Sequence, residues 1–178
     1  MIEYELKFAA KKEDVIKILE MLKCNDHVLS INSWTQINYY YDTENIDFQT
    51  KGTTIRIRQI ENSLKLQIKK KNYYGQYKNL EHQQDIDCIP DTLTIDNRLV
   101  FLKGNLVTER TRHVFDNGIN VDIDINYYCG IVDYEVEVEL PEKEVDLKII
   151  GSILEGLDKS ESGKATRYYA ERMKNVKL

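Results

Sequence analysis

The chain has 178 residues, of which 42% are hydrophobic, so it is long enough to bury the core of one domain. Its formal net charge of -5 argues against a nucleic-acid coat, although 25 lysines and arginines remain for a local basic site. Its three cysteines match neither a disulfide framework nor a metal-binding spacing, and no signal or membrane-spanning pattern is present. We therefore expect a single domain over residues 1–178, soluble and cytoplasmic, without nucleic-acid or membrane partners.

The first seven residues alternate strictly between polar and apolar side chains. In a strand, Glu3, Glu5 and Lys7 share one face. Two neighbouring carboxylates repel each other, so this pair either faces water or binds a cation, and hard divalent ions prefer carboxylate oxygens. The first alternative is the ordinary solvated side of a half-buried strand. The choice between the two depends on the rest of the chain.

Periodicity and turn signals predict eleven further elements along the chain. In order, we expect helix Lys11–Leu22, strands Ser33–Asp42, Thr53–Glu61, Leu64–Lys71 and Asn79–Ile89, helix Leu93–Lys103, strands Leu106–Phe115, Ile119–Asn126 and Val132–Leu140, and helices Val145–Leu157 and Ala165–Val176. With the opening segment this gives eight strands, mostly joined by short connections. Eight is the number at which an antiparallel sheet can close into a barrel around a small ligand.

Most of these strands carry their charges on one face, and the charges are sorted by sign. The basic faces carry Arg56 and Arg58, then Lys65, Lys69 and Lys71, then Arg110 and Arg112; the acidic faces carry Asp122 and Asp124, then Glu135, Glu137 and Glu139. If the sheet closes with this face inward, the charges form an acidic and a basic wall inside. Like charges on neighbouring positions cost energy, which favours a ligand that neutralises them. In an open sheet the same residues are ordinary solvated charge. A metal-bound polyanion would neutralise both walls, with carboxylates on Mg²⁺ or Mn²⁺ and bases on phosphate oxygens.

The motif Glu3-x-Glu5-x-Lys7 and six motifs that follow it in order resemble those of the CYTH, or triphosphate tunnel metalloenzyme, superfamily. The six are Tyr40-Tyr41-Asp42-Thr43, Gly52 through Arg56-Ile57-Arg58, Leu66-Gln67-Ile68-Lys69, Leu80-Glu81, Arg110-Thr111-Arg112 and Glu135-Val136-Glu137. The resemblance covers essentially the whole chain, and segments 80–84 and 133–135 look most like short bacterial members from Firmicutes. The superfamily includes tripolyphosphatases, thiamine triphosphatases and class IV adenylate cyclases.

This resemblance implies an α+β fold, namely an eight-stranded antiparallel β-barrel with flanking helices, whose charged tunnel binds a triphosphate and Mg²⁺ or Mn²⁺. By the resemblance, the metal-side acids are Glu3, Glu5, Glu81, Glu135 and Glu137. The phosphate-binding residues are Lys7, Arg56, Arg58, Lys69, Arg110, Arg112, Lys164 and Arg167, and of these Arg110 and Arg112 are the expected catalytic residues.

Two positions depart from the family pattern. Gln83 stands where many members have a second acid after Glu81, which leaves the number of metals open. Arg110 stands where members that hydrolyse inorganic triphosphate often have lysine. Because arginine keeps its proton, it can stabilise charge but cannot act as a base. The register of Glu139 also allows it to replace Glu135 in the acidic pair.

The resemblance implies metal-dependent hydrolysis of a triphosphate inside the barrel. Inorganic tripolyphosphate, thiamine triphosphate and nucleoside triphosphates are all candidate substrates. Two alternatives stay open: a class IV-type adenylate cyclase that makes cyclic AMP from ATP, and a non-catalytic module that binds a triphosphate or polyphosphate. The missing lysine and second acid are the features that support the second alternative beside the leading interpretation, hydrolysis. The sequence does not distinguish a monomer from a homodimer.

Overall fold

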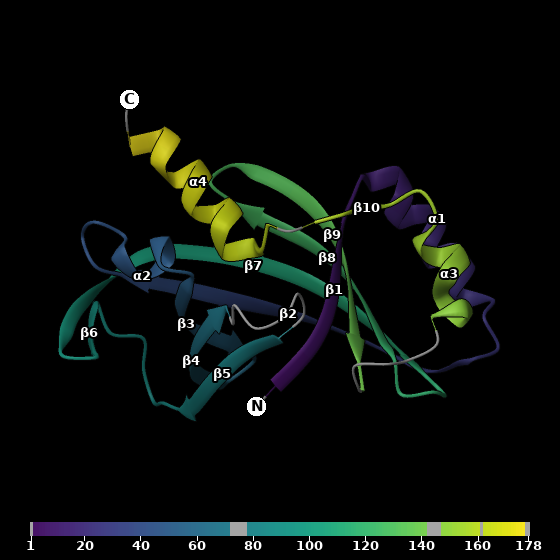
Figure 1. Ribbon diagram of the computed structural model, residues 1–178, viewed down its shortest axis with the longest axis horizontal. Helices are drawn as coiled ribbons and strands as arrows, with labels where there is room; N and C mark the ends of the chain where they lie inside the picture. The colour runs from purple at the N-terminus through teal and green to yellow at the C-terminus, as the bar shows by residue number, and fades with distance from the viewer. Residues whose placement is uncertain (1, 72–77, 142–146, 161, 177–178) are drawn as a thin grey trace.

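The computed structural model describes residues 2–71, 78–141, 147–160 and 162–176. These residues form ten strands and four helices (Figure 1). In chain order they are β1 (Ile2–Ala10), α1 (Lys12–Lys23), β2 (Val28–Asp42), α2 (Asp47–Thr50), β3 (Thr53–Ile60), β4 (Ser63–Lys71), β5 (Lys78–Asp85), β6 (Thr92–Ile95), β7 (Arg98–Phe115), β8 (Asn120–Tyr128), β9 (Ile131–Leu140), α3 (Lys148–Leu154), β10 (Asp158–Lys159) and α4 (Lys164–Val176).

Eight of the strands pair antiparallel in the order β1, β5, β4, β3, β2, β7, β8 and β9, and β9 pairs back with β1. Among the described residues, β1 pairs with β5 over Ile2–Tyr4 and with β9 from Tyr4 onward. The sheet is therefore a tunnel-like barrel that is joined along part of one seam. The predicted class, an α+β antiparallel barrel with flanking helices, is confirmed. Strand β10 pairs with β1, and β6 forms a hairpin with β7.

The apolar face of the barrel points outward and is covered by other elements. Leu6 of β1 and Ile123 of β8 share one buried core with α1 and α3, which lie together beside the barrel in Figure 1. A second core around Ile57 of β3 lies under α2 and β6. Because side chains alternate across a strand, the charged faces point into the barrel. The charges therefore line an interior and are not the solvated side of an open sheet.

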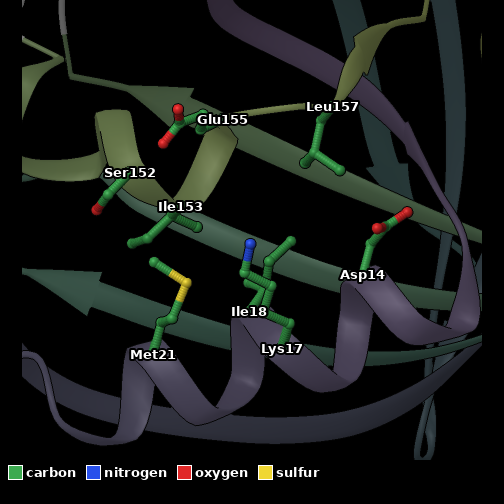
Figure 2. Close-up of a pocket in the computed structure, with 8 residues that line it drawn as sticks. All are labelled: Asp14, Lys17, Ile18, Met21, Ser152, Ile153, Glu155 and Leu157. Carbon is green, nitrogen blue, oxygen red and sulfur yellow. The ribbon is translucent and has the colours of Figure 1, made fainter.

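A small pocket lies outside the barrel, between α1 and α3 (Figure 2). Four residues of α1 line one side, and Ser152, Ile153, Glu155 and Leu157 line the other. None of these residues belongs to a barrel strand, so this pocket is separate from the charged interior.

Helix α4 packs tyrosine rings against the inner face of β2. Tyr168 and Tyr169 lie with their ring centroids 4.9 Å and 5.9 Å from that of Tyr40. The hydroxyl of Tyr168 also donates a hydrogen bond to the backbone carbonyl of Lys103, at 2.8 Å. These contacts hold α4 against the barrel, and the helix carries Lys164 and Arg167 with it.

Gly104 makes this packing of α4 possible. Its φ is +128°, and a Cβ at this position would lie 2.3 Å from the hydroxyl oxygen of Tyr168. We expect Gly104→Ala to lower the free energy of unfolding by roughly 1–3 kcal/mol, because backbone strain and displacement of Tyr168 add. Urea unfolding measures the change. Gly130→Ala is the control, since Gly130 also has positive φ, +78°, but no atom lies within 4 Å of a Cβ there. Equal losses in both variants would show that the contact with Tyr168 is unimportant.

The helix predicted over Leu93–Lys103 is wrong, because this segment belongs to the β6–β7 hairpin. The hairpin turns at Asp96 and Asn97, which have φ of 50° and 58°. Two-residue turns with positive φ at both positions fit the twist of a hairpin and accept Asp and Asn. Asp96-Asn97 therefore marks a turn between two strands and not the interior of a helix.

The other predicted elements are present with shifted ends. Strand β2 begins at Val28 and β7 at Arg98, earlier than expected, whereas β5 ends at Asp85. Helix α3 spans Lys148–Leu154, within the expected 145–157, of which residues 145 and 146 lie outside the described residues. Within the described ranges, no helix is both long and apolar enough to cross a membrane.

Candidate active site in the barrel interior

The acidic wall is formed by β8 and β9, which pair so that Asp124 lies opposite Glu135 and Asp122 opposite Glu137. Asp124, Glu135 and Glu137 are buried, and each offers a carboxylate oxygen within 4.8 Å of those of the other two. Hard divalent ions bind such oxygen ligands. The donor set therefore fits Mg²⁺ or Mn²⁺, the ions that the sequence predicted.

Lysine ammonium groups neutralise this three-acid cluster. The Nζ atom of Lys164 lies 2.7 Å from Asp124 and 2.8 Å from Glu137, and it also contacts Glu135. Lys7 lies 2.6 Å from Glu137. Burial by itself raises the pKa of Glu137, but Lys164, Lys7 and Arg110 outweigh it and hold this pKa well below its ordinary value. Lys164 thus lies among the acids, where an ion at the cluster would compete with its ammonium.

The two expected catalytic arginines are also paired with carboxylates. Arg110 binds both oxygens of Asp124, at 2.7 Å and 2.6 Å, and lies 2.5 Å from Asp122. Arg112 binds both oxygens of Asp122 at 2.7 Å. Bidentate pairs of this kind fix both partners in place. Despite the cost of burial, the surrounding acids Glu137, Asp124 and Asp122 raise the pKa of Arg110 well above its ordinary value.

Arg56 and Arg58 form a contrasting basic wall on β3. Arg56 donates to Oε1 of Gln67 at 2.8 Å, and Arg58 donates to Oδ1 of Asn38 at 3.0 Å. Among the described residues, neither guanidinium forms an ion pair with a carboxylate. Burial, together with the charges of Arg56 and Arg110, lowers the pKa of Arg58 to about 9. The positive charge on this wall is therefore poorly compensated, as expected of a site that binds an anion.

Glu5 lies between two lysines in the barrel interior. Its carboxylate is 3.2 Å from Lys7 and 3.0 Å from Lys69. Burial raises the pKa of Glu5, but Lys7 and Lys69 lower it further, so the net shift is downward. In the described part of the chain, lysines therefore supply positive charge beside the Glu5 carboxylate. Glu81 pairs in register with Lys69 across β4 and β5, whereas the side chain of Glu3 lies outside the described residues.

Arg167 and Glu139 have structural partners. Arg167 lies 2.9 Å from Asp133 and 3.2 Å from Glu135, so it fastens α4 to β9. Glu139 pairs with Arg112 at 2.7 Å, and its side chain is 39% exposed. Because the Glu135 side chain is 1% exposed and belongs to the three-acid cluster, Glu135 and not Glu139 contributes to that cluster.

Sequence reasoning left Asp124 out of the site, although its alternation with Asp122 was a visible signal. It also could not explain Gln83, which accepts a hydrogen bond from Nε2 of Gln67 at 3.3 Å. Gln67 in turn accepts from Arg56. A neutral residue at position 83 thus continues a chain of amides behind Arg56 and adds no negative charge to the basic wall.

These features define a class of protein: an antiparallel barrel with a charged interior, whose acidic wall fits a divalent ion and whose basic wall suits an anion. The CYTH domain family model matches residues 1–169, and the chain belongs to this family. The resemblance to the CYTH family found in the sequence is therefore confirmed. No curated protein matches the chain.

Solved structures share this fold at low sequence identity. A candidate adenylate cyclase from Bacillus halodurans is 20% identical, with a TM-score of 0.74 and coverage of 94% of this chain and 97% of its own. The candidate adenylyl cyclase HpAC1 from Hippeastrum, described as having a dominant triphosphatase activity, is 16% identical, with a TM-score of 0.69 and 95% coverage of both chains. The mimivirus capping enzyme triphosphatase is 13% identical, with a TM-score of 0.52 and 86% coverage of both chains.

Proposed function

We propose that this protein is a triphosphatase that hydrolyses a phosphoanhydride bond of a triphosphate in the barrel interior, with Mg²⁺ or Mn²⁺ as cofactor. The observation that carries the proposal is the contrast between the two walls. Arg56 and Arg58 have no carboxylate partner among the described residues, whereas Asp124, Glu135 and Glu137 form a buried oxygen cluster. A triphosphate with its cation complements both walls at once.

Each part of the interior has a distinct role in this proposal. Asp124, Glu135 and Glu137 would hold the ion, which when bound would neutralise phosphate charge and promote attack by water. Arg56 and Arg58 bind phosphate oxygens and orient the chain of phosphoryl groups. Because arginine keeps its proton, Arg110 acts electrostatically, holding the carboxylates of the acidic wall ionised and in position.

Related folds support hydrolysis without identifying the substrate. The Hippeastrum protein has a dominant triphosphatase activity, and the mimivirus protein is the triphosphatase of a capping enzyme. The second candidate function is cyclisation of ATP, which is favoured by the adenylate cyclase description of the Bacillus halodurans protein. Cyclisation uses the same cradle for the phosphates but also requires a site for adenine and ribose.

The product pattern tests the proposal. Purified protein is incubated with tripolyphosphate, thiamine triphosphate or ATP, each with Mg²⁺, with Mn²⁺ or with excess EDTA. We expect phosphate release that requires the divalent ion, because the ion would neutralise phosphate charge and promote attack by water. Equal phosphate release in EDTA would contradict the proposal. Pyrophosphate together with cyclic AMP would identify a cyclase, and tight binding without any product would identify a binding module.

A further inference from the structure

The inner face of β2 carries an unusual row of buried polar groups. Gln36, Asn38 and Tyr40 are 1%, 0% and 0% exposed. Within the described part of the chain, Nε2 of Gln36, Nδ2 of Asn38 and the hydroxyl of Tyr40 have no hydrogen-bond partner. Buried polar groups nearly always have partners, and leaving one unpaired is costly. Three unpaired groups at successive inward positions of one strand therefore indicate a missing ligand.

Neighbouring groups fix the orientation of both amides. Arg58 can only donate, and its Nε lies 3.0 Å from Oδ1 of Asn38. The indole of Trp34 can also only donate, and its Nε1 lies 3.5 Å from Oε1 of Gln36. In both amides the carbonyl oxygen therefore faces a donor. The NH₂ groups remain as the unpaired atoms, and they require an acceptor.

The row lies beside the basic wall. Asn38 pairs in register with Arg58, and Tyr40 with Arg56. Burial raises the pKa of Tyr40, while the nearby charges of Arg56, Lys164, Arg58 and Arg167 lower it. A region of hydrogen-bond donors among cations repels metal ions and amines. It suits a ligand with many acceptor oxygens and negative charge.

We propose that Gln36, Asn38 and Tyr40 are phosphate ligands, a row of neutral donors along β2 that binds oxygens of a polyphosphate chain beside Arg56 and Arg58. The identification of the anion as a polyphosphate rests on the proposed function. Alternate residues of a strand are about 6.6 Å apart, so the row extends for roughly 13 Å, which suits a chain of phosphoryl groups better than a single phosphate. A shorter anion leaves buried donors unpaired, so the row favours tripolyphosphate over pyrophosphate.

Two tyrosine variants test the proposal, because the chain offers a matched control. The hydroxyl of Tyr169 is also buried without a partner among the described residues, and it belongs to the same aromatic cluster as Tyr40. Its neighbouring charges, however, are Asp42 and Arg172, and not the arginines of the basic wall. Tyr40→Phe and Tyr169→Phe each remove one unpaired buried hydroxyl and keep the ring.

We expect both variants to melt at or above the parent temperature, since each loses an unsatisfied polar group. Calorimetry should show Tyr40→Phe binding tripolyphosphate about tenfold more weakly than the parent, and Tyr169→Phe binding it unchanged within about twofold. Gln36→Met should weaken tripolyphosphate binding as well, and it should weaken pyrophosphate binding less. Phosphate release is measured on the same samples.

The outcomes separate this proposal from the proposed function. Equal affinities of the two tyrosine variants for tripolyphosphate would overturn the proposal that the β2 row binds phosphate, but not the proposed hydrolysis. A large fall in the melting temperature of Tyr40→Phe would also overturn it, because the hydroxyl would then have a structural partner. If the parent binds tripolyphosphate without releasing phosphate, and Tyr40→Phe binds it more weakly, the β2 row is supported as a phosphate site and the proposed hydrolysis is overturned. A parent that binds no polyphosphate would overturn both.

Discussion

Replacing Arg58 with methionine is expected to weaken tripolyphosphate binding by about 100-fold or more and to raise the melting temperature of the ligand-free protein. Arg58 is half-buried, and desolvation together with the charges of Arg56 and Arg110 lowers its pKa to about 9. Removing a poorly compensated charge relieves repulsion in the ligand-free state. Charge-assisted hydrogen bonds to phosphate contribute roughly 1.5–3 kcal/mol each. The loss of two such bonds therefore weakens the affinity by a factor of about 100 or more.

The matched control for this prediction is Arg112→Met. Arg112 pairs with Asp122 and Glu139, so its removal leaves carboxylates with fewer partners. We expect this variant to melt below the parent, opposite in sign to Arg58→Met. Scanning calorimetry gives both melting temperatures, and titration calorimetry gives the affinities. If Arg58→Met were as destabilised as Arg112→Met, the charge of Arg58 would already be compensated without a ligand, and the basic wall would not be an anion site.

The strands of this fold could be predicted because alternation with period two is strong in segments such as Thr54–Arg58. The face that points into the barrel could not be predicted, because alternation separates two faces of a strand without indicating which one other elements pack against. Burial of Leu6 and Ile123 under α1 and α3 decides it in the structure. The prediction for the segment around Asp96–Asn97 was wrong for a different reason. Short apolar runs fit both a helix and a strand, and only the turn between them distinguishes the two structures.

The residue types of the site were visible in the sequence, but their partners were not. Pairing depends on register and on distant elements: Glu135 lies opposite Asp124 because of the β8–β9 register, and Lys164 reaches both from α4. A search for charged motifs also passes over neutral residues such as Asn38. That side chain becomes informative only when its burial and its unpaired atom are known.

The second large expected effect is the loss of stability in Lys164→Met, a change at the acidic wall. In the parent, the Lys164 ammonium contacts Asp124, Glu135 and Glu137, and these three acids lie within 4.8 Å of one another. Removing one partner of a buried ion pair leaves uncompensated charge, which typically costs about 3–5 kcal/mol. Without a divalent ion, we therefore expect the free energy of unfolding to fall by about this amount. Lys174→Met, at an exposed position of the same helix, should have little effect.

Added Mn²⁺ should reverse the loss. In the parent, an ion at the three carboxylates competes with the Lys164 ammonium, whereas in Lys164→Met the cluster is available and still requires positive charge. We therefore expect Mn²⁺ to raise the free energy of unfolding more in Lys164→Met than in the parent or in Lys174→Met. Urea unfolding of the three proteins with Mn²⁺ and with EDTA measures the difference. If Mn²⁺ stabilised Lys164→Met no more than the parent, Asp124, Glu135 and Glu137 would not be the ion site, because the removal of a competing cation can only strengthen binding there.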